Sequence, residues 1–128
     1  MKRLLLVALV LGLMISPEIK AAPADCAQVL TPMGYESITV GATAIGFTST
    51  LITPTGGTPA QYALVTVETN DLRYREDGVS PTNSEGHLVP DGQTIEVCGQ
   101  TTLQRVRFIE AVEAANATIK VSYYKPTN

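Results

Sequence analysis

The 128-residue sequence has no tryptophan, one histidine, two cysteines and two phenylalanines. His87 is the single imidazole, so any histidine-dependent catalytic site would have to be built on it. One histidine and two cysteines do not supply the ligand set of a structural zinc site. Without tryptophan, the chain also lacks the best aromatic platform for stacking a sugar. No metal or other cofactor is therefore expected.

Basic residues are scarce as well. Nine Lys and Arg stand against 12 Asp and Glu, a formal net charge of −3. Residues 25–128 alone hold six basic and eleven acidic residues, a net charge of −5. Because nucleic acid is bound largely through basic residues that release its counterions, no nucleic-acid partner is expected. No stretch of residues 25–128 is long and apolar enough to span a membrane.

The first 24 residues have the order of a secretory signal. A basic start at Lys2 and Arg3 precedes an apolar run of about 12 residues, and Pro17 and the small residues of Ala22–Ala24 follow. A spanning helix needs about 20 apolar residues, so this run is too short for one. The alternative is a buried core helix. We predict a signal helix at residues 1–24 that is cleaved on export, leaving residues 25–128 as one domain.

Both cysteines belong to that domain. Cys26 lies at its start and Cys98 follows a predicted strand. Two cysteines in an exported chain predict one disulfide, and closing a loop of this size would stabilise the fold by roughly 4 kcal/mol. The alternative is a pair of buried free thiols.

Apolar and polar residues alternate with a period of two through most of residues 25–128. That period is typical of half-buried β-strands. The apolar sets are Ile38/Val40, Ile45/Phe47, Ala63/Val65/Val67, Leu72/Tyr74, Ile95/Val97, Val106/Phe108 and Ile119/Val121/Tyr123. Seven or eight short strands in about 100 residues predict an all-β fold. It would be a single antiparallel β-sandwich of immunoglobulin or fibronectin type, or a small barrel.

Turn residues divide these runs. Residues 53–59 (TPTGGTP) and Pro90–Gly92 have the composition of turns, and residues 68–71 (ETND) are short enough for a hairpin. The one helix-like stretch, residues 109–117, is too short to stand alone and is interpreted as a loop or a single turn.

The segment at residues 72–98 gathers most of the candidate chemistry. Ser80, Ser84, Asp77 and Asp91 lie near His87, yet the Gly-x-Ser-x-Gly turn that exposes a nucleophile is missing. A surface histidine is the simpler interpretation.

For the carboxylates too, a surface position is a simpler interpretation than a catalytic role. The pairs Glu68/Asp71 and Glu76/Asp77 are typical of solvated turns. Calcium at Asp71, Asp77 or Glu85 is a further alternative, without the regular acidic spacing of a calcium loop.

Four arginines stand out because they alternate with apolar residues. Arg73 and Arg75, and likewise Arg105 and Arg107, would point outward from their strands and form a basic stripe if those strands were neighbours. The alternative is cross-strand pairing with Glu68, Glu96 or Glu110. Otherwise they would contact a protein partner, because arginine is enriched at interfaces.

Four segments follow one another in a recognisable order: SITVGATAIGFT, the stretch from ALVTVETND through RYREDGVSPTNSEGHLV to QTIEV, LQRVRFIEA and ATIKVSYY. Together they resemble a family of short proteins encoded in bacteriophage structural gene clusters. A weaker similarity is to the immunoglobulin-like module at the end of chitobiase-type glycosidases. Both resemblances imply a small β-sandwich without catalytic residues. The signal-like start and the cysteine pair depart from the phage pattern.

Three functions follow as hypotheses. The first is a non-enzymatic phage-type accessory structural protein, in a capsid or tail, that acts by protein–protein contact. Its interface would include the four arginines, Asp77 and His87. The second is an exported, periplasmic or extracellular, cell-surface adhesion module, which the signal and the disulfide favour. The third is a small secreted enzyme, which would need His87, a serine and a carboxylate in one pocket. Self-association into a homo-oligomer is open in all three.

Overall fold

The computed structural model describes residues 29–127. Seven strands and two short helices make up this part of the chain. In chain order they are β1 (Leu30–Val40), α1 (Ser49–Ile52), β2 (Tyr62–Glu68), β3 (Leu72–Arg75), β4 (His87–Val89), β5 (Thr94–Cys98), α2 (Gln100–Arg105), β6 (Arg107–Glu110) and β7 (Ala117–Pro126).

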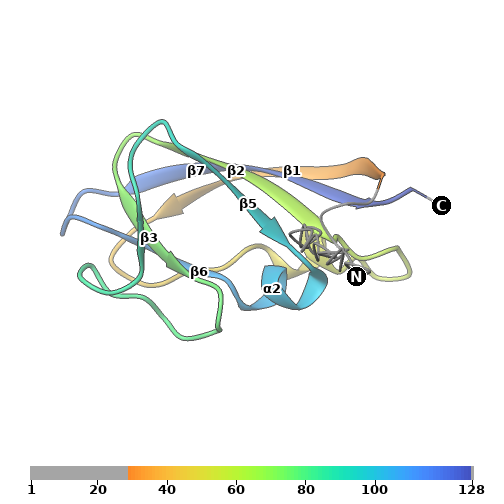
Figure 1. Ribbon diagram of the computed structural model, residues 1–128, viewed down its shortest axis with the longest axis horizontal. Coiled ribbons are helices and arrows are strands. Elements are labelled where there is room, and N and C mark those ends of the chain that lie inside the picture. Colours follow the sequence, from red (N-terminus) through yellow and green to blue (C-terminus); the bar gives the residue numbers. More distant parts are fainter. Residues whose placement is uncertain (1–28, 128) are drawn as a thin grey trace, which may run out of the picture.

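The strands form two antiparallel sheets, so the predicted β-sandwich is confirmed. One sheet has the order β1-β7-β2-β5 and the other β4-β3-β6. Figure 1 shows β1, β7 and β2 in one layer, with β3 and β6 in the layer below. In a constant-type immunoglobulin domain the last strand lies in the sheet opposite the one that contains the first two strands. Here the last strand, β7, lies between the first two strands, β1 and β2, in the same sheet.

The period of two explains why the two sheets pack together. Successive side chains of a strand point to opposite faces, and every second residue of β2 and β7 is buried. The innermost side chains come from Ala63, Val65 and Val67 of β2 and from Ile119, Val121 and Tyr123 of β7, all with no exposed surface. These are the residues that the alternation selects, so the core of the four-stranded sheet is as predicted.

Two connections switch sheets where the sequence suggests simple turns. Residues 69–71 lead from β2 in the four-stranded sheet to β3 in the other, so the predicted hairpin at residues 68–71 is wrong. The turn at Pro90–Gly92 is confirmed by the bond from Gln93 N to Pro90 O at 3.2 Å. It too joins the two sheets, because β4 pairs with β3 and β5 pairs with β2.

The two helices were not predicted. Each has one fully buried side chain, Ile52 in α1 and Leu103 in α2, which is too little to produce a helical period in the sequence. Residues 111–116 form a turn, in keeping with the predicted loop. The strand expected around Ile45 is reduced to a single bridge to Phe108, with N–O distances of 2.9 and 2.8 Å.

Residues 1–24 and Cys26 lie outside the described residues, so the signal helix and the pairing of Cys26 with Cys98 stay predictions. Cys98 ends β5. Along residues 29–127, no helix has the length and the apolar character needed to cross a membrane.

Candidate functional site

The connection between β3 and β4 is the longest one between the helices and strands of the described chain. It spans residues 76–86 and joins two strands that pair directly, with Leu72 opposite Val89 and Tyr74 opposite His87. In Figure 1 it lies on the side of β3 and β6 that faces away from the four-stranded sheet. Strand β4 was not among the predicted strands, and it lies within the stretch between the two that were predicted there, around Leu72–Tyr74 and Ile95–Val97.

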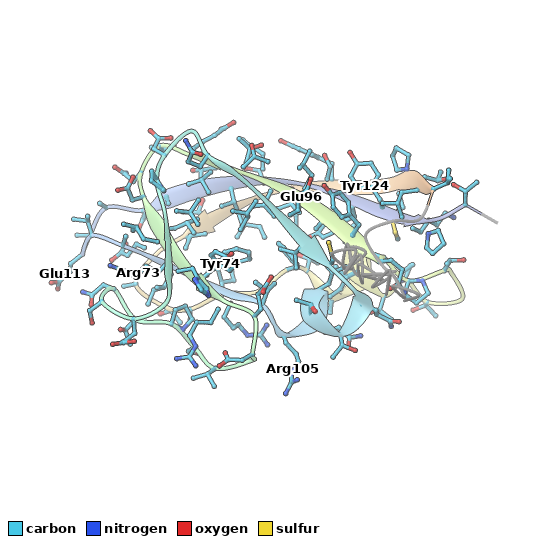
Figure 2. The ribbon with its side chains drawn as sticks, viewed as in Figure 1. Arg73, Tyr74, Glu96, Arg105, Glu113 and Tyr124 are labelled. Atoms are coloured by element: carbon cyan, nitrogen blue, oxygen red, sulfur yellow. The ribbon has the colours of Figure 1, made fainter. Side chains whose placement is uncertain are left out.

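Arg73 holds this loop in place. Its side chain lies on the outer face of the three-stranded sheet, where Nε donates to the carbonyl of Asn83 and Nη1 donates to the carbonyl of Gly86, both at 2.9 Å. Hydrogen bonds from a charged donor stabilise more than neutral ones. Figure 2 shows Arg73 at the end of the molecule where this loop lies. Its guanidinium is bonded within the protein, and its contact with a partner stays a prediction.

The loop also has a packed interior. Pro81 is buried, and a Cβ added at Gly86 would lie 3.1 Å from the Cβ of Pro81 and 2.9 Å from the carbonyl oxygen of Tyr74. Gly86 has a φ of +123°, which side chains rarely allow. Sequence analysis missed the role of Pro81 and Gly86, although Gly86 follows a turn at Thr82–Glu85 and both lie in the stretch that carries the phage resemblance.

Arg75 and Asp77 form an ion pair at the start of the loop, with both carboxylate oxygens facing the guanidinium. The Asp77 carboxylate also accepts the backbone N–H of Val79 at 3.1 Å. The hydrogen bond from Arg75 is the largest of the effects that lower the pKa of Asp77, to about 2. Side chains of the pair are 33% and 53% exposed, so the pair orders the loop more than it stabilises the fold.

Acid should therefore loosen this end of the loop. A carboxyl with a lowered pKa favours the folded loop above about pH 4, the pKa of a free aspartate, and that contribution is lost as the pH falls toward 2. We expect the amide signal of Val79 to shift with a midpoint near pH 2 in an NMR titration. Asp77→Asn should abolish this step. A midpoint at pH 4 would contradict the ion pair.

A shallow hollow of about 460 Å³ opens beside the ion pair. It is lined by Arg75, Glu76, Asp77, Glu85, Gly86 and His87. His87 is exposed, and its ring packs on Tyr74 with a centroid distance of 5.3 Å. The structure thus brings together Arg75, Asp77 and His87, three of the residues predicted to form an interface.

Arg105 is close to the same loop but not on a strand. It is the last residue of α2, which corrects the prediction that it projects from a strand with Arg107. Its side chain is exposed, and a Cβ added at Gly78 would lie 3.3 Å from its Nε. Figure 2 shows Arg105 extending from the molecule below α2, away from the sheets.

Arg107 turns away from the loop. It lies opposite Arg75 in the pairing of β3 with β6, so the two strands are neighbours, which was the condition for a basic stripe. Its Nη1, however, donates to the carbonyls of Gln104 at 3.1 Å and Val106 at 2.8 Å.

The expected pairing of the four arginines with Glu68, Glu96 or Glu110 is wrong for the described part of the chain. There the ion pair joins Arg75 and Asp77. Glu110 is instead buried, and its Oε1 accepts the amide of Ala114 at 2.9 Å.

The acidic residues considered for calcium are spread over different sites. Asp71 accepts the amide of Asp91 at 2.9 Å at a corner between the sheets, while Asp77 pairs with Arg75. Within residues 29–127, three or more Asp, Glu, His or Cys side chains do not gather where they would hold a metal ion.

Comparison of the chain with protein-family models, with curated proteins and with solved structures found no match. The candidate site is therefore interpreted from its own geometry. It is a protruding loop held by internal hydrogen bonds, with charged side chains on its surface.

Proposed function

We propose that the protein is a non-enzymatic binding module that contacts a protein partner through one surface. This surface, the loop face, comprises Arg75, Asp77, Val79, His87 and Arg105. It would act as an accessory structural protein of phage type, such as a capsid decoration or a tail-associated module.

The observation that carries the proposal is the rigid support of an exposed loop. Residues 76–80 and 82–85 are exposed, while Arg73 and Pro81 hold them from below. A loop that is already ordered loses less conformational entropy when it binds, so more of its contact energy appears as affinity. This is what an interaction surface requires.

The composition of the loop face fits a protein partner. Val79 is 53% exposed in the middle of the loop. The Asp77 carboxylate accepts its amide, and Arg105 lies beside the preceding residue, Gly78. Interfaces combine apolar contact area with arginine side chains, and a central arginine can contribute 2 kcal/mol or more to binding. The role in a virion rests on the sequence resemblance, whose most specific part is residues 73–89.

Binding to phage particles tests the proposal. Purified protein would be sedimented with particles from the same host, and the bound fraction measured against protein concentration. We expect Arg105→Ala to weaken binding about tenfold or more. Arg105 makes no hydrogen bond to any described residue, so this change should leave the fold intact. Lys120→Ala is the matched control, because Lys120 lies on the outer face of the four-stranded sheet and bonds to Ser37.

The outcomes separate the hypotheses. Equal binding by Arg105→Ala and the wild type would refute the loop face as the interface. Saturable binding to whole host cells, without binding to particles, would favour the second candidate, an exported cell-surface adhesion module. The signal-like residues 1–24 are the observation that favours this candidate.

A further inference from the structure

A second hollow lies away from the loop face, between α2 and the segment that leads into α1. It has a volume of about 490 Å³. Ile45, Phe47 and Ile52 supply its apolar lining, and Ser49, Gln104 and Arg107 supply polar groups. We call it the arginine groove. Its size is within the range of sites for small molecules, and its lining combines polar and apolar groups in similar measure.

Arg107 occupies this groove in a fixed position. Its Nη1 is bonded to the carbonyls of Gln104 and Val106. A Cβ added at Gly46 would lie 2.6 Å from the same nitrogen, so the glycine leaves the space that the guanidinium fills. Two carbonyls and a glycine therefore orient the side chain.

Two other nitrogens of this guanidinium, Nε and Nη2, can donate hydrogen bonds to a ligand. Nε and Nη2 have no hydrogen-bond partner in the described part of the chain, and the ion pair found there belongs to Arg75. These two N–H groups are parallel and match the two oxygens of a carboxylate. Arg107 is thus a half-buried cation with a free bidentate edge.

We infer that the arginine groove binds a small amphipathic carboxylate, with its carboxylate on Arg107 and its apolar part against Ile45, Phe47 and Ile52. A phosphate would bring more charge than one arginine offsets, and it would leave the apolar lining unused. The planar guanidinium and the adjacent apolar wall together favour a carboxylic acid with an aliphatic or aromatic tail. This inference concerns a different surface from the loop face and does not rest on the proposed function.

The test compares hexanoate with 1-hexanol by NMR titration of the full chain. The two probes have the same tail and differ in the group that would meet Arg107. We expect hexanoate to shift the amides of Ile45, Gly46 and Phe47 in a saturable way and to bind at least tenfold more tightly than the alcohol. Arg107→Gln should remove this preference and retain the weak binding of the alcohol.

Two further variants complete the design. Lys120→Gln makes the same change in net charge on a distant face and should bind hexanoate as the wild type does. Ser49→Trp should fill the groove and abolish binding of both probes, and it decides the question if Arg107→Gln does not fold. Equal affinity for hexanoate and hexanol, shifts that map outside the groove, or hexanoate binding that survives Ser49→Trp would each overturn the inference.

Discussion

Replacing Arg73 with alanine is expected to release the loop at residues 76–86 while the sandwich stays folded. The change removes two hydrogen bonds from a charged donor, to the carbonyls of Asn83 and Gly86. Such bonds contribute about 1.5 to 3 kcal/mol each, and the partial exposure of this site brings the combined loss below their sum, to about 2 kcal/mol. The sheet should survive, because the core side chain on the same strand, Leu72, is unchanged.

Hydrogen exchange measures this release directly. The amides of Thr82 and Glu85, which bond to each other's carbonyls at 3.0 and 3.3 Å, should exchange about 30-fold faster, since 1.4 kcal/mol corresponds to a factor of ten. Amides of β7 should keep their wild-type rates.

Arg105→Ala is the matched control, since it removes an arginine that lies beside the loop without a hydrogen bond to any described residue. Its loop amides should exchange at the wild-type rate. Unchanged exchange at Thr82 in Arg73→Ala would show that the loop is held by something other than Arg73. If the loop face is the interface, Arg73→Ala should also weaken partner binding, although Arg73 would not touch the partner.

The sandwich could be predicted because the alternation of apolar residues reports directly which side chains face the core. Val65, Val67, Ile119 and Val121 come from the two central strands, and each is fully buried as its position in the pattern requires. The strand order could not be predicted in this way. Alternation fixes the inward face of β7 but contains no information about which strands lie beside it.

The short helices escaped prediction for a related reason. Residues 100–105 (QTTLQR) place a single apolar side chain, Leu103, against the core, and one residue has no period. Arg105 was assigned to a strand because Val106 and Phe108 alternate with two arginines. In the structure the strand begins only at Arg107, so Arg105 is carried by the helix.

The sequence located the candidate site, but it did not predict which groups the arginine side chains bond to. Composition singled out the loop and its arginines, and Arg75, Asp77 and His87 do share a hollow. Whether an outward arginine meets solvent or a carbonyl depends on how the following loop folds back, which is a long-range feature. Arg73 bonds to the carbonyls of Asn83 and Gly86 for this reason. Arg107 instead bonds through Nη1 to the carbonyls of Gln104 and Val106, which come just before it in the chain.

A partly exposed hydrogen-bond network around Glu36 explains how the non-strand segment before α1 is fixed to the four-stranded sheet. The hydroxyl of Tyr123 donates to Glu36 Oε1. Thr48 donates its amide to the same oxygen at 3.0 Å and its hydroxyl to Oε2 at 2.6 Å. Phe47 packs edge-on against the ring of Tyr123, with centroids 5.4 Å apart. The carboxylate therefore joins β1, β7 and the start of α1.

Tyr123→Phe should destabilise the protein by about 2 kcal/mol, because it removes a bond to a charged acceptor in a site with no exposed tyrosine surface. For a domain of about 100 residues this corresponds to a melting temperature roughly 10 °C lower. Tyr124→Phe is the control. Its ring packs on Tyr62 at 5.4 Å on the opposite face, and its hydroxyl makes no hydrogen bond to any described residue. We expect its melting temperature to change by less than about 2 °C.

The same network predicts how stability depends on alkaline pH. Burial, and then the hydrogen bond to Glu36, raise the pKa of Tyr123 above its ordinary value. A tyrosine in the unfolded chain ionises near pH 10, so the contribution of the neutral, hydrogen-bonded side chain is complete below that pH and is lost as the pH rises further. The free energy of unfolding should therefore fall above pH 10, and less steeply in Tyr123→Phe than in Tyr124→Phe. Parallel curves for the two variants would mean that the folded protein does not raise the pKa of Tyr123.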